Sequence, residues 1–435
     1  MEDPAQIIAS YLQHISYDDL NDKVIREVKR RLIDSIAVAR GALNAPPIQL
    51  SRTLLSNFPG NSLTIDGYRT SPDFSAFYNT FMIRYLDFND TYLSKEPLHP
   101  SDMFGALLAV GSLFDKSGKD LILATAIGYE VGVRLCDSTS LRHKGFDHVN
   151  FLEVATAAAL AKLLNLDEEK ARNAISLSIV PHVALRETRV GELSMWKAGA
   201  AAEASRNAVF SALLAMAGIT GPKTPFIGKF GFMSLIAKDM DLKVFDNLGS
   251  PNSILRTYIK KYPVEYHAQA AVDVAKSINY EGEITKVVVE TYEAAKTILA
   301  DTEDKWKPTT KETADHSLPY IIAYTLIHKD LWLDAYDNLT DPKVVDLMKK
   351  IVIEEVPEYT KVYPNELPIK LTVYTTKGVY TNEVRVPRGH SANPMSDEEV
   401  EEKFLRLNGK REELKLLWDL ENVKVSELVR SLTKS

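Results

Sequence analysis

Apolar residues recur at helical spacing through most of the first half of the chain. This pattern predicts helices over Ile7–His14, Val24–Leu43, Phe104–Phe114, Asp120–Leu135, Val154–Leu164 and Lys170–Leu177. A further helix, rich in alanine, is expected over residues 198–217 and should end at Gly218. Small side chains let helices approach closely, so we expect this helix in the interior of a helical bundle.

The pattern changes after about residue 284, where short runs rich in β-branched residues begin. The predicted strands are Ile284–Tyr292, Ile351–Val356, Ile369–Val373 and Val379–Val386. A turn around Lys377-Gly378 should join the last two strands in a hairpin. Ser317–His328 is predicted to be a helix between strands, and the tail Asp397–Leu428 returns to charged amphipathic helix.

The order of these elements predicts a mainly α fold with an inserted α/β domain. Residues 1–260 and 390–435 should form a large all-helical bundle domain, and residues 261–389 a smaller α/β lid domain. Ligand clefts favour domain interfaces, and two connections would let the smaller domain close over a ligand.

Composition places the chain among globular proteins, since it has 435 residues of which 45% are hydrophobic and 26% charged. A net charge of −7 gives no global electrostatic argument for nucleic acid or an anionic membrane as a partner. The first residues are acidic where a signal peptide would be basic, so we expect a cytoplasmic protein. The one cysteine, Cys136, lies in an apolar stretch and reads as a buried thiol, and no zinc-ligand spacing exists.

The densest group of polar residues lies in segment 84–105, between two apolar runs. It contains Asp87, Asn89, Asp90, Thr91, His99, Ser101 and Asp102. Polar groups are not buried without partners, so this segment either lines a pocket or is a solvated loop that caps the following helix. Both interpretations are compatible with the spacing.

Two further clusters precede predicted helices. Asp147, His148 and Asn150 stand before Val154–Leu164, where Asn150 could be a cap and His148 adds a titratable group. Lys197 stands at the start of the Ala-rich helix, where the helix dipole disfavours a cation. We therefore expect Lys197 to have an anionic ligand or a buried carboxylate as its partner.

The remaining candidates lie in or near the predicted α/β domain. Lys260 and Lys261, with His267 after them, mark the crossing between the domains. His316 and Tyr320 stand at the start of an apolar helix, although a capped helix start alone would explain that segment. His390, in a turn-rich return path, is expected to be solvated.

These residue types narrow the chemistry. The chain has no phosphate-binding glycine loop, no Gly-x-Gly-x-x-Gly after a strand, no His-Glu-x-x-His and no nucleophile elbow, so nothing in it implies a cofactor or a metal. Histidine, aspartate, lysine, arginine and tyrosine suit proton abstraction beside a carboxylate, with cations holding the substrate. Dehydration, decarboxylation or epimerisation of a di- or tricarboxylic acid would all fit.

Several segments together resemble the signature segments of the MmgE/PrpD superfamily. They are Asp-Phe-Asn-Asp-Thr (87–91), His-Pro-Ser-Asp (99–102), Gly-Phe-Asp-His-Val (145–149), Trp-Lys-Ala-Gly (196–199), Lys-Tyr-Pro (261–263), Glu-Thr-Ala-Asp-His-Ser-Leu-Pro-Tyr (312–320) and Gly-His-Ser-Ala-Asn-Pro-Met (389–395). The superfamily includes 2-methylcitrate dehydratase, cis-aconitate decarboxylase and iminodisuccinate epimerase. The resemblance implies a helical domain with an inserted α/β lid, a homodimer and no essential cofactor.

From the clusters and the resemblance together we expect two sets of site residues. The catalytic set is Asp87, His99, His148, Lys197 and Tyr320, and the substrate-binding set is Thr91, Lys260, Lys261, His267 and His316. Segment 312–320 is most similar to the dehydratase members, which implies dehydration of 2-methylcitrate, with citrate as a second substrate, in propionate catabolism. The alternatives are a cis-aconitate decarboxylase, another lyase or epimerase of di- or tricarboxylates, and a non-catalytic scaffold.

Overall fold

The chain forms two compact units in a computed structural model that describes residues 2–191 and 193–433. The first unit comprises Met1–Thr257 and Ser396–Ser435, and the second comprises Tyr258–Met395. The first unit is thus built from both ends of the chain, with the second between them in sequence. The structure is mainly helical with one small mixed sheet.

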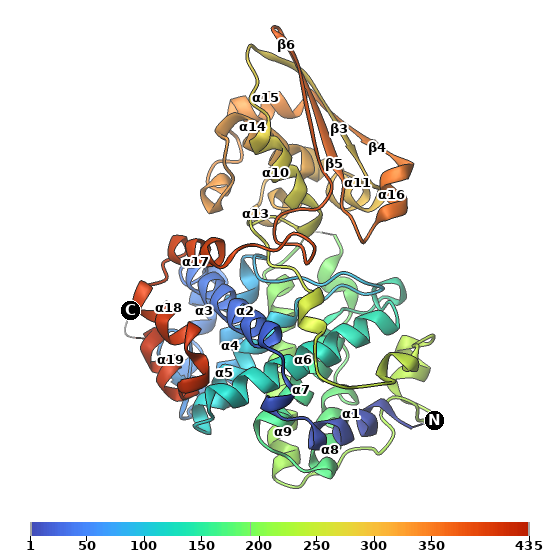
Figure 1. The fold of residues 1–435 in the computed structure, drawn as a ribbon, viewed down its shortest axis with the longest axis vertical. Coiled ribbons are helices and arrows are strands. Elements are labelled where there is room, and N and C mark those ends of the chain that lie inside the picture. Colours follow the sequence, from blue (N-terminus) through green and yellow to red (C-terminus); the bar gives the residue numbers. More distant parts are fainter. Residues whose placement is uncertain (1, 192, 434–435) are drawn as a thin grey trace. The chain divides into compact units, whose positions relative to one another are not determined.

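The first unit is helical almost throughout (Figure 1). Its helices are α1 (Pro4–His14), α2 (Asp22–Gly41), α3 (Pro46–Arg52), α4 (Pro72–Tyr85), α5 (Phe104–Leu113), α6 (Gly118–Ser138), α7 (Val149–Leu163), α8 (Glu168–Ile179), α9 (Trp196–Met216), α17 (Asp397–Arg406), α18 (Arg411–Trp418) and α19 (Val425–Thr433), joined in places by short 3₁₀ helices. Two strands of two residues each, β1 (Ser62–Leu63) and β2 (Arg69–Thr70), pair antiparallel.

The core of the first unit is formed by helices that are apolar on all sides. Every residue of α5 from Phe104 to Ser112 is buried, as expected of a helix without a polar face. A side chain at Gly105 would meet Thr80 Oγ1 of α4 at 2.1 Å, so the glycine permits close packing of α4 and α5. Helix α9 buries all of its alanines, which confirms the predicted interior position of the Ala-rich helix. Cys136 is also buried, as predicted.

The amphipathic tail is divided into three helices. Helix α17 begins with a capping box between Ser396 and Glu399. It ends at Arg406, and Asn408 then adopts a left-handed conformation with φ 68°, followed by Gly409. A β-carbon at Gly409 would lie 2.2 Å from the Phe404 ring, so this position requires glycine and ends the helix.

The second unit contains a four-stranded mixed sheet in the order β4-β3-β5-β6. Strands β3 (Ile284–Thr291) and β4 (Ile351–Glu355) pair parallel, whereas β3 with β5 (Ile369–Thr375) and β5 with β6 (Gly378–Val384) pair antiparallel. The predicted hairpin is therefore confirmed. The helices of this unit are α10 (Gln269–Ser277), α11 (Glu293–Leu299), α12 (Glu303–Trp306), α13 (Lys311–Ala314), α14 (Leu318–His328), α15 (Pro342–Met348) and α16 (Pro357–Val362).

One face of this sheet is the core of the second unit. Val287, Val289, Leu371 and Val373 alternate with more exposed residues along β3 and β5 and are fully buried. Helices α10 and α14 lie beside this sheet (Figure 1) and supply the facing apolar side chains.

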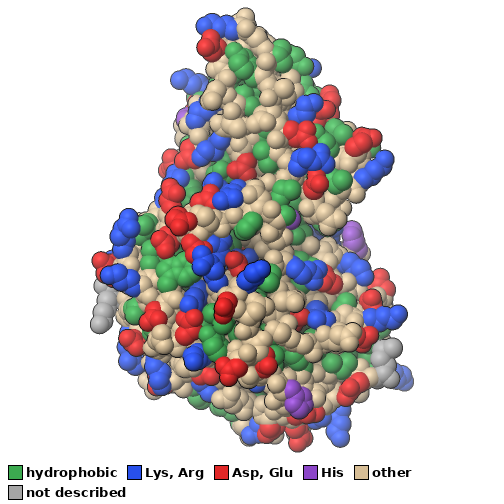
Figure 2. Space-filling model, in the orientation of Figure 1, with side chains coloured by type: hydrophobic (Ala, Val, Ile, Leu, Met, Phe, Trp, Pro, Cys, Tyr) green, Lys and Arg blue, Asp and Glu red, His purple; other side chains and the backbone are tan. Residues whose placement is uncertain are grey.

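Charged side chains of both signs are interspersed over the face of the molecule shown in Figure 2. Opposite charges pair at many surface positions, for example Lys307 with Glu303 at 3.4 Å. Among the described residues, none of the helices is both long and apolar enough to cross a membrane.

Candidate active site

The polar segment that follows α4 is folded back on itself and largely buried. Tyr92 and Leu98 form an antiparallel bridge that closes the loop, and a 3₁₀ helix, Pro100–Met103, then leads into α5. Asp87 adopts a left-handed conformation with φ 52° just after α4 and forms a buried ion pair with Arg84 from the last turn of that helix. The sequence cluster is therefore a buried structure and not a solvated loop.

Asp90 holds this segment together from the inside. Its carboxylate accepts hydrogen bonds from Ser101 N at 2.9 Å and from the hydroxyl of Tyr129 in α6 at 2.5 Å. The backbone carbonyl of Asp90 lies 2.8 Å from His99 Nδ1, which also lies 3.0 Å from Thr91 Oγ1. A carbonyl only accepts, so Nδ1 of His99 carries a proton, and Nε2 is the ring nitrogen at which the imidazole can gain or lose one.

A second histidine lies against the first. The ring centroids of His99 and His148 are 5.5 Å apart, in an edge-to-face arrangement. His148 precedes α7 and places Nδ1 3.2 Å from Asp147 Oδ1, while Arg189 Nε holds the other oxygen of Asp147 at 2.9 Å. Among the described residues nothing forms a hydrogen bond to the buried Nε2 of His148.

The protonation of this pair follows from burial and nearby charges. Burial lowers the pKa of His148 to about 3. The attraction of Asp147 opposes this effect, and repulsion by Arg189, Arg84 and Arg186 adds to it. Burial alone would raise the pKa of Asp147, but Arg189 and His148 outweigh it, and the pKa is lowered. At neutral pH the site therefore holds a neutral imidazole oriented by a carboxylate, in a cationic environment.

Asp102 lies behind the same segment with no exposed surface. Burial raises its pKa to about 7, against the attraction of Arg84 and the hydrogen bond from Asn89. Asn89 Nδ2 donates to Asp102 Oδ1 at 2.8 Å and to Ser101 Oγ at 2.9 Å. Asp102 thus fixes the loop that carries His99 and titrates near neutrality.

Lys197, in the first turn of α9, has its partner in this cluster. Its Nζ lies 3.5 Å from Asp87 Oδ2, and its backbone carbonyl accepts a hydrogen bond from Arg189 at 2.8 Å. The helix dipole disfavours a cation at this position, and Asp87 is a buried carboxylate of the kind the sequence argument required. The structure thus brings together Asp87, Thr91, His99, His148 and Lys197, which we name the His99–His148 cluster.

The cluster is supported by a lysine from the far end of the chain. Lys403 of α17 is buried, pairs with Asp34 of α2 at 2.6 Å and donates a hydrogen bond to the Phe88 carbonyl at 2.8 Å. Its Nζ also lies 3.7 Å from the centroid of the Phe88 ring. Lys403 thereby anchors the residue between Asp87 and Asn89.

Three candidates of the second unit, Lys260, His267 and His316, lie around Glu265. Glu265 contacts His267 Nδ1 at 2.9 Å, and His267 Nε2 lies 3.3 Å from the Tyr363 hydroxyl. Burial opposes ionisation of Glu265, but His267, His316 and Lys260 outweigh it and hold its pKa at about 2. Lys260 is buried, whereas Lys261 is half-buried with its backbone N donating to Gln269. His316 pairs with Asp315.

Two further residues of the second unit, Tyr320 and His390, are both buried. Tyr320 is fully buried in the core of the second unit, and its hydroxyl donates to the Ala335 carbonyl. Its proposed catalytic role stays a prediction, and the surroundings give it no support. His390 was expected to be solvated, which is wrong: it is buried, stacks on Tyr258 at 4.4 Å between ring centroids, and burial lowers its pKa to about 4.

Four residues that shape the His99–His148 cluster were not among the expected site residues: Arg84, Asp147, Arg189 and Lys403, although Asp147 stood in one of the candidate segments. The available signal for Arg84 was a charged residue among the apolar positions of α4, because such a residue needs a buried partner. Lys403 gave a weaker signal: it lies three residues after Val400, on the apolar face of the charged, amphipathic α17. Within the described part of the chain, no group of three or more His, Cys, Asp and Glu side chains is arranged to hold a metal ion.

The His99–His148 cluster has the groups needed for general acid–base chemistry on a small anionic molecule. Comparison with known proteins is consistent with this class. Residues 6–244 match the model of the MmgE/PrpD N-terminal domain, and residues 262–415 match that of the MmgE/PrpD C-terminal domain. The chain belongs to the MmgE/PrpD family.

Several relatives share most of their length with this chain. A 2-methylcitrate dehydratase of Cupriavidus necator is 27% identical over 430 residues, which cover 89% of this chain and 86% of the relative. A 2-methylcitrate dehydratase of Salmonella typhimurium is 30% identical over 401 residues, which cover 83% and 80%. An alkylcitrate dehydratase from a fungus is 27% identical over 441 residues, which cover 92% and 86%.

Proposed function

We propose that this protein is a hydro-lyase that removes water from 2-methylcitrate to form 2-methylaconitate, with citrate as a second substrate. The family membership and the names of the similar dehydratases support the reaction type. The observation that carries the proposal is the neutral His148 imidazole, oriented by Asp147 and surrounded by guanidinium groups.

The elimination needs a base for a carbon-bound proton. His148 is neutral at physiological pH, and its Nε2 has no hydrogen-bond partner among the described residues, so its lone pair is available for a substrate proton. The carbanion that develops next to a carboxylate is stabilised by positive charge, and Asp147 stabilises the imidazolium that forms. We assign the base to His148.

The elimination also needs an acid for the departing hydroxyl. His99 lies beside His148 and is held by the Asp90 carbonyl, so it can present Nε2 to the opposite end of the same substrate. In the proposed step His99 enters as the imidazolium, with one proton on Nδ1 toward the Asp90 carbonyl and a second on Nε2. His148 takes the C–H proton, the C–H electron pair forms the double bond, the C–O bond breaks, and the Nε2 proton of His99 leaves with the hydroxyl as water. Lys197 and the nearby arginines would hold the carboxylates.

The proposal is tested by assaying the purified protein with 2-methylcitrate, citrate and cis-aconitate in parallel. Formation of the conjugated product is followed by ultraviolet absorbance, and decarboxylation by release of carbon dioxide. Turnover of 2-methylcitrate exceeding that of citrate supports the proposal. Carbon dioxide release from cis-aconitate without turnover of 2-methylcitrate would assign the decarboxylase instead. No turnover and no thermal stabilisation by any of the three acids would favour the scaffold.

A further inference from the structure

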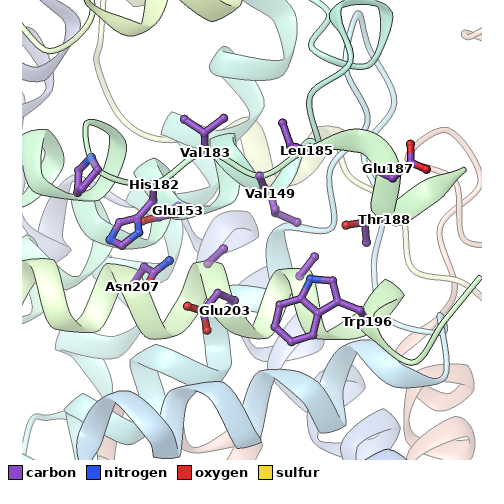
Figure 3. A pocket seen from close by; sticks show the side chains of 14 residues that line it. Val149, Glu153, His182, Val183, Leu185, Glu187, Thr188, Trp196, Glu203 and Asn207 are labelled. Carbon is purple, nitrogen blue, oxygen red and sulfur yellow. The ribbon is translucent and has the colours of Figure 1, made fainter.

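A cavity of the first unit lies between α7, the segment 181–188 and α9, with a volume of about 470 Å³ (Figure 3). This volume is in the range of small-molecule sites. Figure 3 shows Glu153 and His182 together at one end, near Asn207 of α9, and Trp196 at the other. We name this cavity the Glu153 pocket.

Glu153 is the unusual residue of this pocket. Its side chain projects from α7 into the lining, it is only 5% exposed, and its Oε1 has no hydrogen-bond partner among the described residues. Buried polar groups in folded proteins are almost always paired, because an unpaired one loses its hydration without replacement. A buried carboxyl oxygen that lines a cavity and has no protein partner can accept a hydrogen bond from a ligand.

The charges around Glu153 select the kind of donor. A second carboxylate, Glu203, lines the same pocket, and it is paired with Arg206 at 2.7 Å and 2.9 Å. Burial raises the pKa of Glu153 well above its usual range and the charge of Glu203 raises it further, whereas burial lowers the pKa of His182. Among the described residues that line the pocket there is no lysine or arginine. Burial keeps Glu153 protonated in the empty pocket, and a bound cation, unlike an anion, would favour its ionised form and pair with it.

The rest of the lining favours an organic cation over a hydrated inorganic ion. Val149, Val183, Leu185 and Ala200 give the walls an apolar character, and Trp196 lies at the far end and is 46% exposed. No arrangement of three or more His, Cys, Asp and Glu side chains in the described chain fits a metal ion. An ammonium group can donate to Glu153 and Asn207 while an attached alkyl chain contacts the walls.

We propose that the Glu153 pocket is a binding site for a small primary alkylamine, separate from the His99–His148 cluster and opposite to it in charge preference. The ammonium group binds Glu153 and the carbonyl oxygen of Asn207, and the alkyl chain lies toward Leu185 and Trp196. Charge-assisted hydrogen bonds are the strongest available to such a ligand, so Glu153 carries most of the selectivity.

The test uses the full-length protein and n-butylammonium chloride, with titration calorimetry to measure affinity. Tetramethylammonium chloride and sodium butyrate at the same ionic strength are the ligand controls, since one lacks an N–H donor and the other carries the wrong charge. We expect saturable binding of n-butylammonium alone. The Glu153→Gln variant keeps the size of the side chain and should bind n-butylammonium about tenfold or more weakly.

The matched control is Glu187→Gln, because Glu187 lines the same pocket but is exposed. Circular dichroism should show both variants folded, and Glu153→Gln at least as stable as the parent, since it removes a buried carboxyl group without a partner. Unchanged binding in Glu153→Gln, equal loss in Glu187→Gln, saturable binding of butyrate, or no binding of n-butylammonium at millimolar concentration would each overturn the proposal.

Discussion

Replacing Lys403 by methionine should destabilise the protein and impair the His99–His148 cluster together. The substitution keeps the length and apolar stem of the side chain but removes the charge that pairs with Asp34 and the donor that binds the Phe88 carbonyl. Both partners are buried, with Asp34 at 0% exposure and Lys403 at 3%. The variant therefore leaves a carboxyl group and a carbonyl in the interior without their main partner.

The size of the expected loss in the free energy of unfolding follows from the burial of the Lys403–Asp34 pair. Breaking a buried ion pair by removing one partner costs about 3–5 kcal/mol, mostly because the remaining charge is uncompensated. Burial already raises the pKa of Asp34, so in the variant this carboxyl group takes up a proton and the loss should lie near 3 kcal/mol. Phe88 is next to Asp87, so kcat should fall as well.

Urea unfolding followed by circular dichroism measures the loss as a lower midpoint at unchanged slope. Lys415→Met is the matched control, because Lys415 is an exposed lysine of the neighbouring α18 and should change the free energy of unfolding by less than about 0.5 kcal/mol. Adding Asp34→Asn to Lys403→Met should recover part of the loss. A loss below about 1 kcal/mol for Lys403→Met would refute the argument, since exposed ion pairs contribute that little.

Three other outcomes are expected. Lys197→Ala should lower kcat/KM at least about tenfold while leaving the urea midpoint nearly unchanged, because Asp87 keeps Arg84; unchanged kinetics would remove Lys197 from the site. The pKa of His148 falls from 6.5 to about 3 on folding, so the unfolded state binds the extra proton and stability drops as pH falls through this window. Between pH 6.5 and about pH 5 that drop is about 2 kcal/mol, and His148→Gln should lack it in urea titrations; an identical pH dependence would contradict the buried neutral imidazole. Finally, light scattering should show a two-fold homodimer, and a mass equal to one chain would contradict it.

The sequence predicted the elements whose own pattern specifies them. Apolar residues throughout Phe104–Leu113 and alternation along Ile369–Thr375 are local signals, and both elements formed as expected. Lys197 was also interpretable locally, because its place at a helix start required an anion, and Asp87 supplies it. The sequence could not show that this anion would be Asp87 and not a ligand.

Contacts between distant segments explain what the sequence could not predict. Lys403 and Asp34 lie at opposite ends of the chain, and nothing in either segment indicates the other. Tyr320 shows the opposite failure: its segment carries a family motif, but the helix turns the ring into the core, where a backbone carbonyl satisfies its hydroxyl. A polar tip on a large apolar ring is compatible with either position.

The rate of 2-methylcitrate turnover by the parent protein and by His148→Gln is the most direct measurement of the proposed chemistry. Both proteins are assayed with saturating 2-methylcitrate by absorbance of the conjugated product, after circular dichroism shows that both are folded. If His148 removes the proton, kcat should fall about 10²–10⁴-fold with a much smaller change in KM. A fall of only a few-fold in kcat would contradict the assignment of the base to His148 and the mechanism built on it.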